Sequence, residues 1–513
     1  MFGIIGVFVL LLACINFMNL STARSEKRAR EVGIRKSVGS LRGQLIGQFL
    51  GESIFMALLS FILSLVLVQA ALPWFNSVSD KQIHIFWNSL YFWLPALGLT
   101  LLVGLIAGSY PAFYLSSFNP VKVLKGTFRA GRAAALPRQV LIVVQFTVSV
   151  ALIIGTIIVF EQVLYVKNRP VGYSRDGLIT VDILNNDIPN HFAALRQTLI
   201  QSGLAADACM SSSPTTDVWN NQSGFTWEGK DPTMTPTFAV FWNTMDYGPT
   251  VGWQLKEGRD FSRDFLSDSL GMILNETAVR YMGLKDPIGA RVRFAHGLQD
   301  AQFYHVIGVV SDMVMQSPFA PVKQAIYMLD LNNNVNVATV KINPHMSASQ
   351  ALPAIGEVFK KYNPAVPFAY TFNDDAYAQK FAMEDRIGKL AGFFTILAIF
   401  ISCLGLFGMA SFMAEQRIKE IGVRKVLGAS VVNLWGLLSR DFVLLVGLSF
   451  FIAIPLAYHV MSGWLLHYDY RVTISLWVFV VTVVLALAIT LATVSYQTIR
   501  AAMANPVKSL RTE

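Results

Sequence analysis

Two nine-residue segments of the chain, 31–39 and 420–428, carry the same charged residues and glycines at the same spacing. The first reads Glu-Val-Gly-Ile-Arg-Lys-Ser-Val-Gly and the second Glu-Ile-Gly-Val-Arg-Lys-Val-Leu-Gly. One basic segment after an apolar run usually only fixes orientation in a membrane. The same pattern twice indicates a surface that docks a partner. The docking residues would be Glu31, Gly33, Arg35, Lys36 and Gly39 in the first segment, and Glu420, Gly422, Arg424, Lys425 and Gly428 in the second.

Each docking segment is expected to form a short amphipathic helix at the membrane surface. Helical spacing puts Val32, Ile34 and Val38 on or near one apolar side, with Arg35 and Lys36 toward solvent or headgroups. The first glycine of each segment allows close backbone approach. The second glycine can end the helix in the left-handed conformation.

Two acidic residues, Glu52 and Asp441, occupy matching positions near the inner start of the next apolar run. A carboxylate this close to hydrocarbon is costly unless it is paired or hydrated. One interpretation pairs each acid with a nearby basic residue, Arg35 or Arg424, so that the docking helix moves with the next span. The other interpretation leaves each acid as an interfacial carboxylate that faces water.

Other patterns in the sequence do not point to catalysis, a metal ion or a cofactor. A nucleotide-binding loop needs glycines followed by Lys and Ser or Thr, whereas the glycines of 126–131 are followed by Arg-Ala. The seven histidines and three cysteines have no metal-ligand spacing. Asp374 and Asp375 are adjacent, as solvated acids often are. The sequence therefore predicts no enzyme activity and no metal site.

Membrane spans are the elements that must position these residues. Of 513 residues, 54% are hydrophobic and 14% charged, against about 45–50% and 25% in soluble domains. The apolar runs hold almost no charge, and polar residues such as Gln145 and Ser149 occur singly in them. A conducting pore would need ionisable groups facing a cavity, so their absence from the runs argues against one. Runs of about 20 apolar residues suffice to cross a bilayer. Seven are predicted, at about 2–20, 45–72, 91–116, 139–160, 388–412, 437–460 and 474–497.

The formal charge of +9 is distributed unevenly along the chain. Residues 162–383 hold 17 Lys and Arg against 20 Asp and Glu, whereas the rest of the chain holds 24 against 12. Basic residues gather after the first, third, fifth and seventh spans, so those segments and the C-terminus are predicted to be cytoplasmic and 162–383 to lie outside. The charge thus reports orientation, and it does not indicate nucleic-acid binding.

Residues 162–383 are predicted to form a mixed α+β domain, large enough to bury its own core. Short β-type runs alternate with helical ones. The strands are expected at Leu178–Ile183, Phe303–Val310 and Val337–Ile342, and the helices at Ile188–Gln201 and Ser347–Tyr362.

An internal repeat organises the spans. Setting each residue against the one 389 positions later gives 8 identities over residues 14–43, among them Cys14 with Cys403. With an offset of 386, the Asn-Pro-Val-Lys of 119–122 falls on that of 505–508. A three-span unit therefore occurs twice, and only the second copy is preceded by a span and a polar domain. By symmetry, we expect a complete chain to have another span and another outer domain before residue 1.

These motifs resemble the FtsX/MacB-like permeases of ABC transporters, whose signature is similar to segments 31–39 and 420–428. Similar stretches also occur at Gly258–Phe261, Asn275–Val279 and Val306–Asp312. The likeness covers nearly the whole chain and is nearest to the eight-span duplicated permeases of Bacteroidota. The chain departs from that pattern by lacking the first span and the first periplasmic domain.

The resemblance implies an α-helical integral membrane protein of the bacterial inner membrane, with two FtsX-like repeats and an inserted α+β domain like the periplasmic core domain of MacB. It implies that the docking segments are coupling helices seated on two copies of a cytoplasmic ATPase, which binds the ATP, so that the chain itself needs no cofactor. The expected domain boundaries are 1–126 for the first repeat, 127–138 for a cytoplasmic linker, 139–161 for a span, 162–383 for the periplasmic domain and 384–513 for the second repeat. The coupling helices are expected at about 25–42 in the first repeat and at about 414–431 in the second.

The function implied by the resemblance is transmission of ATP-driven motion across the membrane, for export or extraction of a lipophilic or peptide-like substrate. It also allows a periplasmic or outer-membrane partner. The alternative is a membrane-anchored sensor or scaffold whose outer domain binds a ligand without ATP-driven work. The sequence does not identify the substrate.

Overall fold

The structure is a computed structural model, and it describes residues 2–117, 132–295 and 301–503. The chain divides into two compact units. A helical unit comprises Met1–Gln162, Glu384–His467 and Val472–Glu513, and a sheet unit comprises Val163–Met383 and Tyr468–Arg471. The repeated Asn-Pro-Val-Lys motifs at 119–122 and 505–508 lie outside the described residues.

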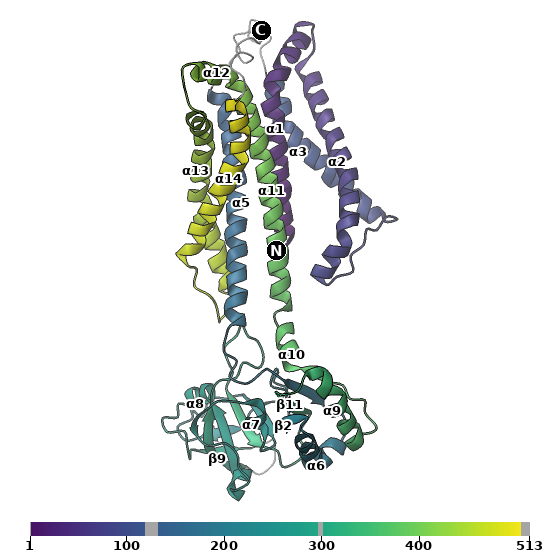
Figure 1. The fold of residues 1–513 in the computed structure, drawn as a ribbon, viewed down its shortest axis with the longest axis vertical. Helices are drawn as coiled ribbons and strands as arrows, with labels where there is room; N and C mark the ends of the chain where they lie inside the picture. The colour runs from purple at the N-terminus through teal and green to yellow at the C-terminus, as the bar shows by residue number, and fades with distance from the viewer. Residues whose placement is uncertain (1, 118–131, 296–300, 504–513) are drawn as a thin grey trace. The chain divides into compact units, whose positions relative to one another are not determined.

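Long apolar helices make up the helical unit (Figure 1). Among the described residues, six of them are long and apolar enough to cross a membrane, and a shorter apolar stretch covers Ile5–Ser21. Each predicted span falls on one of these helices. They are α1 (Phe2–Ser37), α2 (Arg42–Ser79), α3 (Leu90–Ser116), α5 (Arg132–Lys167), α11 (Ala382–Gln416), α13 (Val431–Leu465) and α14 (Leu476–Met503), with the short α12 (Ile418–Val426) after α11.

The core of the helical unit lies between α5, α11, α13 and α14. Val150, Ile154, Val446 and Ala453 belong to one buried cluster of apolar side chains there. The opposite faces of the helices stay apolar and exposed, as on α2, where Ile62 is 61% exposed. Such faces suit contact with lipid. The side chains are apolar, and a spanning helix satisfies its own backbone hydrogen bonds without water.

Among the described residues, one mixed sheet of 12 strands forms the centre of the sheet unit. Most neighbouring strands are antiparallel, but β5 and β10 are parallel, as are β7 and β9. The order is β12-β1-β11-β2-β5-β10-β7-β9-β8-β4, with β3 on β5 and β6 on β9. The strands are β1 (Leu178–Asp182), β2 (Ala205–Ser211), β3 (Asn221–Gln222), β4 (Phe225–Trp227), β5 (Phe238–Asn243), β6 (Leu255–Gly258), β7 (Gly271–Asn275), β8 (Arg291–Phe294), β9 (Gln302–Val310), β10 (Ala325–Leu329), β11 (Val337–Ile342) and β12 (Thr371–Phe372).

Helices and loops cover the sheet and close separate apolar clusters against it. Leu195 of α6 and Ile355 of α9 pack with Val340 of β11 in one cluster.

The remaining helices are α7 (Tyr247–Val251), α8 (Glu276–Met282) and α10 (Asn373–Gln379), with a 3₁₀ turn η1 at Leu266–Leu270. The elements α6 (Asp187–Gln201) and α9 (Ala348–Tyr362), with β1, β9 and β11, match the predicted runs to within one residue, so the mixed α+β domain is confirmed.

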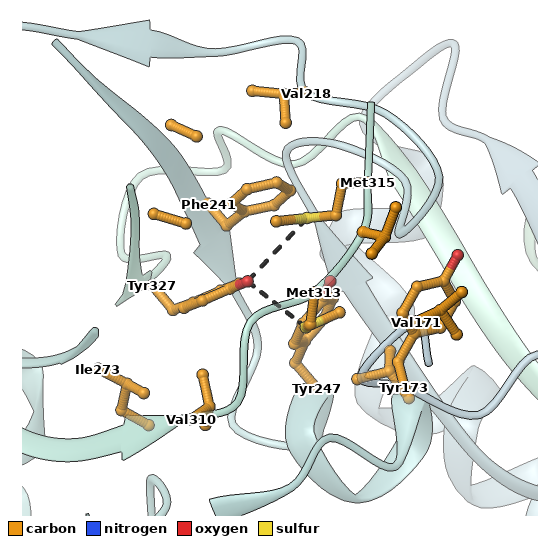
Figure 2. Packing of buried hydrophobic residues seen from close by; sticks show 14 of the residues in the cluster. Val171, Tyr173, Val218, Phe241, Tyr247, Ile273, Val310, Met313, Met315 and Tyr327 are labelled. Atoms are coloured by element: carbon orange, nitrogen blue, oxygen red, sulfur yellow. Dashed lines mark hydrogen bonds between the residues drawn. The ribbon is translucent and has the colours of Figure 1, made fainter. Parts of the chain in front are cut away.

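A second cluster packs aromatic rings against methionines (Figure 2). The Tyr327 hydroxyl points at two sulfur atoms, 3.4 Å from Met313 Sδ and 4.0 Å from Met315 Sδ. Thioethers are weak acceptors that adapt to irregular cavities, so they satisfy a buried hydroxyl without a charged group. The two thioethers thus serve as the acceptors of the Tyr327 hydroxyl.

Candidate functional site

The first docking segment forms the last turns of α1, which runs unbroken from Phe2 to Ser37. This differs from the predicted short surface helix. No glycine or proline occurs between residues 7 and 32, so nothing in the sequence interrupts the helix. The second segment does form a separate helix, α12, which follows the end of α11 at Gln416 although no glycine or proline marks that break.

Gly39 ends the first segment in the left-handed conformation, with a φ of 105°. The Ser40 N–H donates to the Arg35 carbonyl at 3.0 Å, and the Gly39 N–H donates to the Lys36 carbonyl at 3.1 Å. These two bonds define a Schellman motif, which satisfies carbonyls that a helix end otherwise leaves open.

Gly428 ends the second segment in the same way, with a φ of 91°. The Ala429 N–H donates to the Arg424 carbonyl at 2.9 Å, and the Gly428 N–H donates to the Lys425 carbonyl at 3.1 Å. The predicted left-handed end is thus confirmed at both glycines. The two segments share a backbone conformation as well as a sequence.

Matching side chains anchor both segments to the helix that follows. In the first repeat, Val32 packs with Leu45 and Phe49 of α2, and all three are at most 8% exposed. The second repeat buries the residues exactly 389 positions later, Ile421, Leu434 and Leu438, at 4% or less exposed. Each docking segment is therefore packed against its own following helix.

The apolar residues of a segment do not share one side, contrary to the prediction for Val32, Ile34 and Val38. Val32 faces inward, whereas Ile34 and Val38 are 49% and 83% exposed. In a helix of 3.6 residues per turn, positions 32 and 34 lie about 200° apart, so they cannot face the same way. The matching Val423 and Leu427 are 49% and 80% exposed. Each segment thus presents two apolar side chains outward.

An ion pair lies beside these apolar side chains in each segment. Glu31 pairs with Arg35 at 2.7 Å, and Glu420 pairs with Arg424 at 2.7 Å. All four side chains are between 42% and 56% exposed. Exposed pairs one helical turn apart add only about 0.3–0.5 kcal/mol. Their contribution is therefore to orient charge at the surface more than to stabilise the helix.

Both interfacial acids have polar partners, but Asp441 does not pair with the predicted Arg424. Glu52 accepts from Gln48 Nε2 at 3.2 Å, and Gln48 Oε1 in turn accepts from Arg35, so Glu52 joins the docking segment through an amide. Asp441 pairs with Arg417 at 3.1 Å instead of with the arginine of its docking segment. Arg417 lies at the junction of α11 and α12, so this pair ties the junction to α13.

Lys36 contributes to packing inside the first repeat. Its Nζ atom donates to the Ser116 carbonyl at the end of α3, at 2.7 Å. Burial, and then the nearby charge of Arg42, lower the pKa of the Lys36 ammonium. Lys36 was expected to face solvent or headgroups. Its partner Ser116 lies 80 residues away and belongs to no motif, so the sequence alone does not reveal this contact.

Hydroxyl side chains bridge α5 and α11 inside the spans, and one of them is Ser149. Its hydroxyl lies 2.8 Å from the Ser402 hydroxyl, and the Thr156 hydroxyl lies 2.7 Å from that of Thr395. The two contacts lie seven residues apart on α5 and on α11. They bind these helices together without introducing charge.

The sheet unit also includes a short segment between two apolar helices. Residues 468–471, here named the strap, connect α13 and α14. The Tyr470 N–H donates to the Phe319 carbonyl at 3.0 Å, and the Tyr470 ring stacks on Tyr165 with 4.8 Å between centroids. The Arg169 guanidinium lies over the same ring at 4.3 Å. The sequence signal that could have indicated this packing is the presence of two tyrosines, Tyr468 and Tyr470, in a short loop.

The adjacent acids of the sheet unit lie at the start of a helix. Asp374 and Asp375 lie in the first turn of α10, where the helix dipole favours negative charge. Burial, and then the charge of Asp176, raise the pKa of the Asp374 carboxyl. Within the described ranges, no group of His, Cys, Asp and Glu could hold a metal ion.

The chain has apolar helices long enough to span a bilayer, and they precede and follow a mixed sheet domain in the sequence. This arrangement defines a multi-pass membrane protein. Residues 3–120 and 392–506 each match the family described as FtsX-like permease C-terminal. The matched regions begin 389 residues apart and end 386 residues apart, which are the two offsets of the internal repeat. The chain thus carries two regions that match an FtsX-like permease, as the resemblance predicted.

One curated relative is the macrolide export ATP-binding/permease protein MacB of Aggregatibacter actinomycetemcomitans, 25% identical over 200 residues. The match covers 37% of this chain and 30% of the relative, so the chain spans less than a third of that protein's length.

Among solved structures, the chain is similar to the periplasmic region of MacB from Actinobacillus actinomycetemcomitans, at 17% identity and a TM-score of 0.29, covering 42% of this chain and 96% of that one. A domain of a putative permease from Porphyromonas gingivalis shows 16% identity and a TM-score of 0.27, with 39% and 91% covered. The extracellular domain of the transporter YknZ from Gram-positive bacteria shows 16% identity and a TM-score of 0.25, with 37% and 98% covered.

Proposed function

We propose that this chain is the membrane subunit of an ABC transporter and that it docks two copies of a separate cytoplasmic ATPase through segments 31–39 and 420–428. ATP-driven movement of these segments is passed to the sheet unit, which lies on the periplasmic side of the bacterial inner membrane and handles a lipophilic or peptide-like substrate. The C-terminus lies in the cytoplasm.

The observation that carries this proposal is the twofold construction of the docking segments. Both have an inward anchor, a Schellman cap, an exposed ion pair and two exposed apolar side chains at matching positions. A loop that only fixes orientation needs positive charge, but it needs neither a rigid cap nor an anchor. Exposed apolar side chains rimmed by charge on a rigid helix are the chemistry of a protein interface.

The test is the number of ATPase copies that co-purify with the full-length chain from its host. The unaltered chain is expected to hold two copies of one P-loop ATPase. Ile34→Asp should reduce this to one copy, Val423→Asp should do the same, and the double variant should hold none. Each substitution puts a charge on an exposed side chain, so the fold is expected to survive.

Leu184→Asp in the sheet unit is the matched control, because Leu184 is 72% exposed and lies outside both segments. It should leave two copies bound. If the unaltered chain binds no ATPase, or if the double variant still binds two copies, the docking role is wrong, and a sensor or scaffold without ATP-driven work becomes the better interpretation.

A further inference from the structure

Three helices of the helical unit meet at Gly405 of α11. A methyl group added at Gly405 would lie 2.8 Å from the Oδ1 atom of Asn16 on α1 and 3.0 Å from the Nε2 atom of Gln145 on α5. A methyl group at Gly408, three residues further along, would lie 2.0 Å from Cδ2 of Leu20 on α1. The two glycines therefore give α1 room to lie directly against α11.

The two amide groups over Gly405 are complementary. Asn16 Oδ1 is an acceptor and Gln145 Nε2 is a donor, and both atoms are buried without a hydrogen-bond partner among the described residues. They lie 2.8 and 3.0 Å from one point, so they are no more than 5.8 Å apart. One bridging water, or a small rotation of either amide, would join them. An apolar layer favours that bond, because no bulk water can satisfy either atom.

The contact also joins equivalent positions of the internal repeat. Position 405 is 16 plus 389, so Asn16 faces its own counterpart, Gly405. Equivalent positions that face each other mark the axis about which two copies of a unit pair. Here the pair is unequal, with an amide side chain on α1 and no side chain on α11. Two helices like α1 would set asparagine against asparagine, and two helices like α11 would leave a gap.

We propose that Asn16 and Gln145 form an amide clasp over Gly405, and that this clasp selects α11 of the same chain as the partner of α1. The surface it defines is an interface between the two permease regions of one chain, closed to a second copy. Buried polar side chains are best known for setting register and choice of partner. The clasp does not depend on the ATPase docking proposed above.

A double-mutant cycle on the full chain in detergent tests the clasp. Asn16→Leu and Gln145→Leu each remove one amide and leave the other unpaired, so each should lower the melting temperature. The double variant leaves neither amide, so its loss should be smaller than the sum of the two single losses. Strictly additive losses would overturn the clasp.

A glycine pair on α11 provides a matched control. Gly405→Val pushes a branched side chain toward both amides, whereas a Cβ atom at Gly392 on the same helix would meet nothing within 4 Å, so Gly392→Val starts from open space. Both changes carry the same cost in helix propensity. Gly405→Val should therefore lower the melting temperature by clearly more than Gly392→Val, and an equal effect would count against the proposal.

Cross-linking in native membranes tests the choice of partner, and it needs only that the chain reaches the membrane. Leu20→Cys with Gly408→Cys, in a background where Cys14 and Cys403 are serine, leaves the clasp intact. Oxidation by copper phenanthroline should link the two cysteines within one chain, seen as a monomer whose mobility shifts back on reduction. A disulfide-linked dimer, or a mixed dimer between two differently tagged chains, would show that α1 pairs with a second copy.

Discussion

Replacing Gly428 by alanine isolates the contribution of the cap that ends the second docking segment. Gly428 has a φ of 91°, and a Cβ atom there would meet nothing within 4 Å. The substitution therefore adds backbone strain without a steric collision. A left-handed conformation costs a residue with a Cβ atom about 1–2 kcal/mol. Strain of that size lowers the population of the capped conformation by a factor of about 5–30.

Hydrogen exchange of the full chain measures this population directly. The amides of residues 428 and 429 donate to the Lys425 and Arg424 carbonyls, so they are protected only while the cap is formed. In Gly428→Ala their exchange rates should rise by the same factor of about 5–30. Gly39→Ala should do the same in the first segment, where a Cβ atom also meets nothing within 4 Å.

Gly428→Asn is the matched control for Gly428→Ala, because asparagine enters the left-handed region more easily than alanine. Its amides should exchange more slowly than those of the alanine variant. Equal protection in the alanine, asparagine and unaltered chains would refute the view that the cap holds the segment rigid. Equal loss in both variants would show that the side chain, and not backbone strain, is what the site rejects.

Three further outcomes follow from contacts described above. Arg417→Ala and Asp441→Asn should show a coupling of up to about 1 kcal/mol in a thermal-unfolding cycle, because the pair is partly exposed, whereas Arg424→Ala should show none with Asp441→Asn. Burial raises the pKa of the Asp260 carboxyl, so folding favours its protonated form. The melting temperature should therefore fall as pH rises from about 4 through the raised pKa. Asp260→Asn should flatten that fall, and an unchanged slope would contradict the assignment. Tyr470→Ala removes the ring that Tyr165 and Arg169 contact and should destabilise the sheet unit by about 1–2 kcal/mol, whereas Leu331→Ala, at an exposed position, should not.

Local signals in the sequence sufficed for the apolar helices, for three of the strands and for the two glycine caps. Apolar runs and their lengths located the helices, because a bilayer accepts little else. The glycine that ends each docking segment was predictable because few residues tolerate a positive φ. Gly39 and Gly428 both adopt it.

Contacts between distant residues were the part that the sequence did not reveal. Glu52 reaches Arg35 through Gln48, which stands one helical turn before Glu52 but belongs to no motif. Arg417 is the counterpart of Arg28 in the internal repeat, 389 residues later. Its pairing with Asp441, however, depends on a break between α11 and α12 that no proline or glycine signals. Such pairs follow from tertiary geometry, which a single sequence specifies only through the whole fold.

The strap has a practical consequence for anyone who wishes to study the sheet unit alone. Residues 163–383 look like an insert that could be excised and expressed. That fragment would lose Tyr468 and Tyr470, which pack against its aromatic and methionine cluster, and it would leave the ring of Phe319 without one of its neighbours. A soluble fragment is therefore expected to need residues 468–471 attached through a linker. Without them, measurements of its stability or binding would describe a core with an open side.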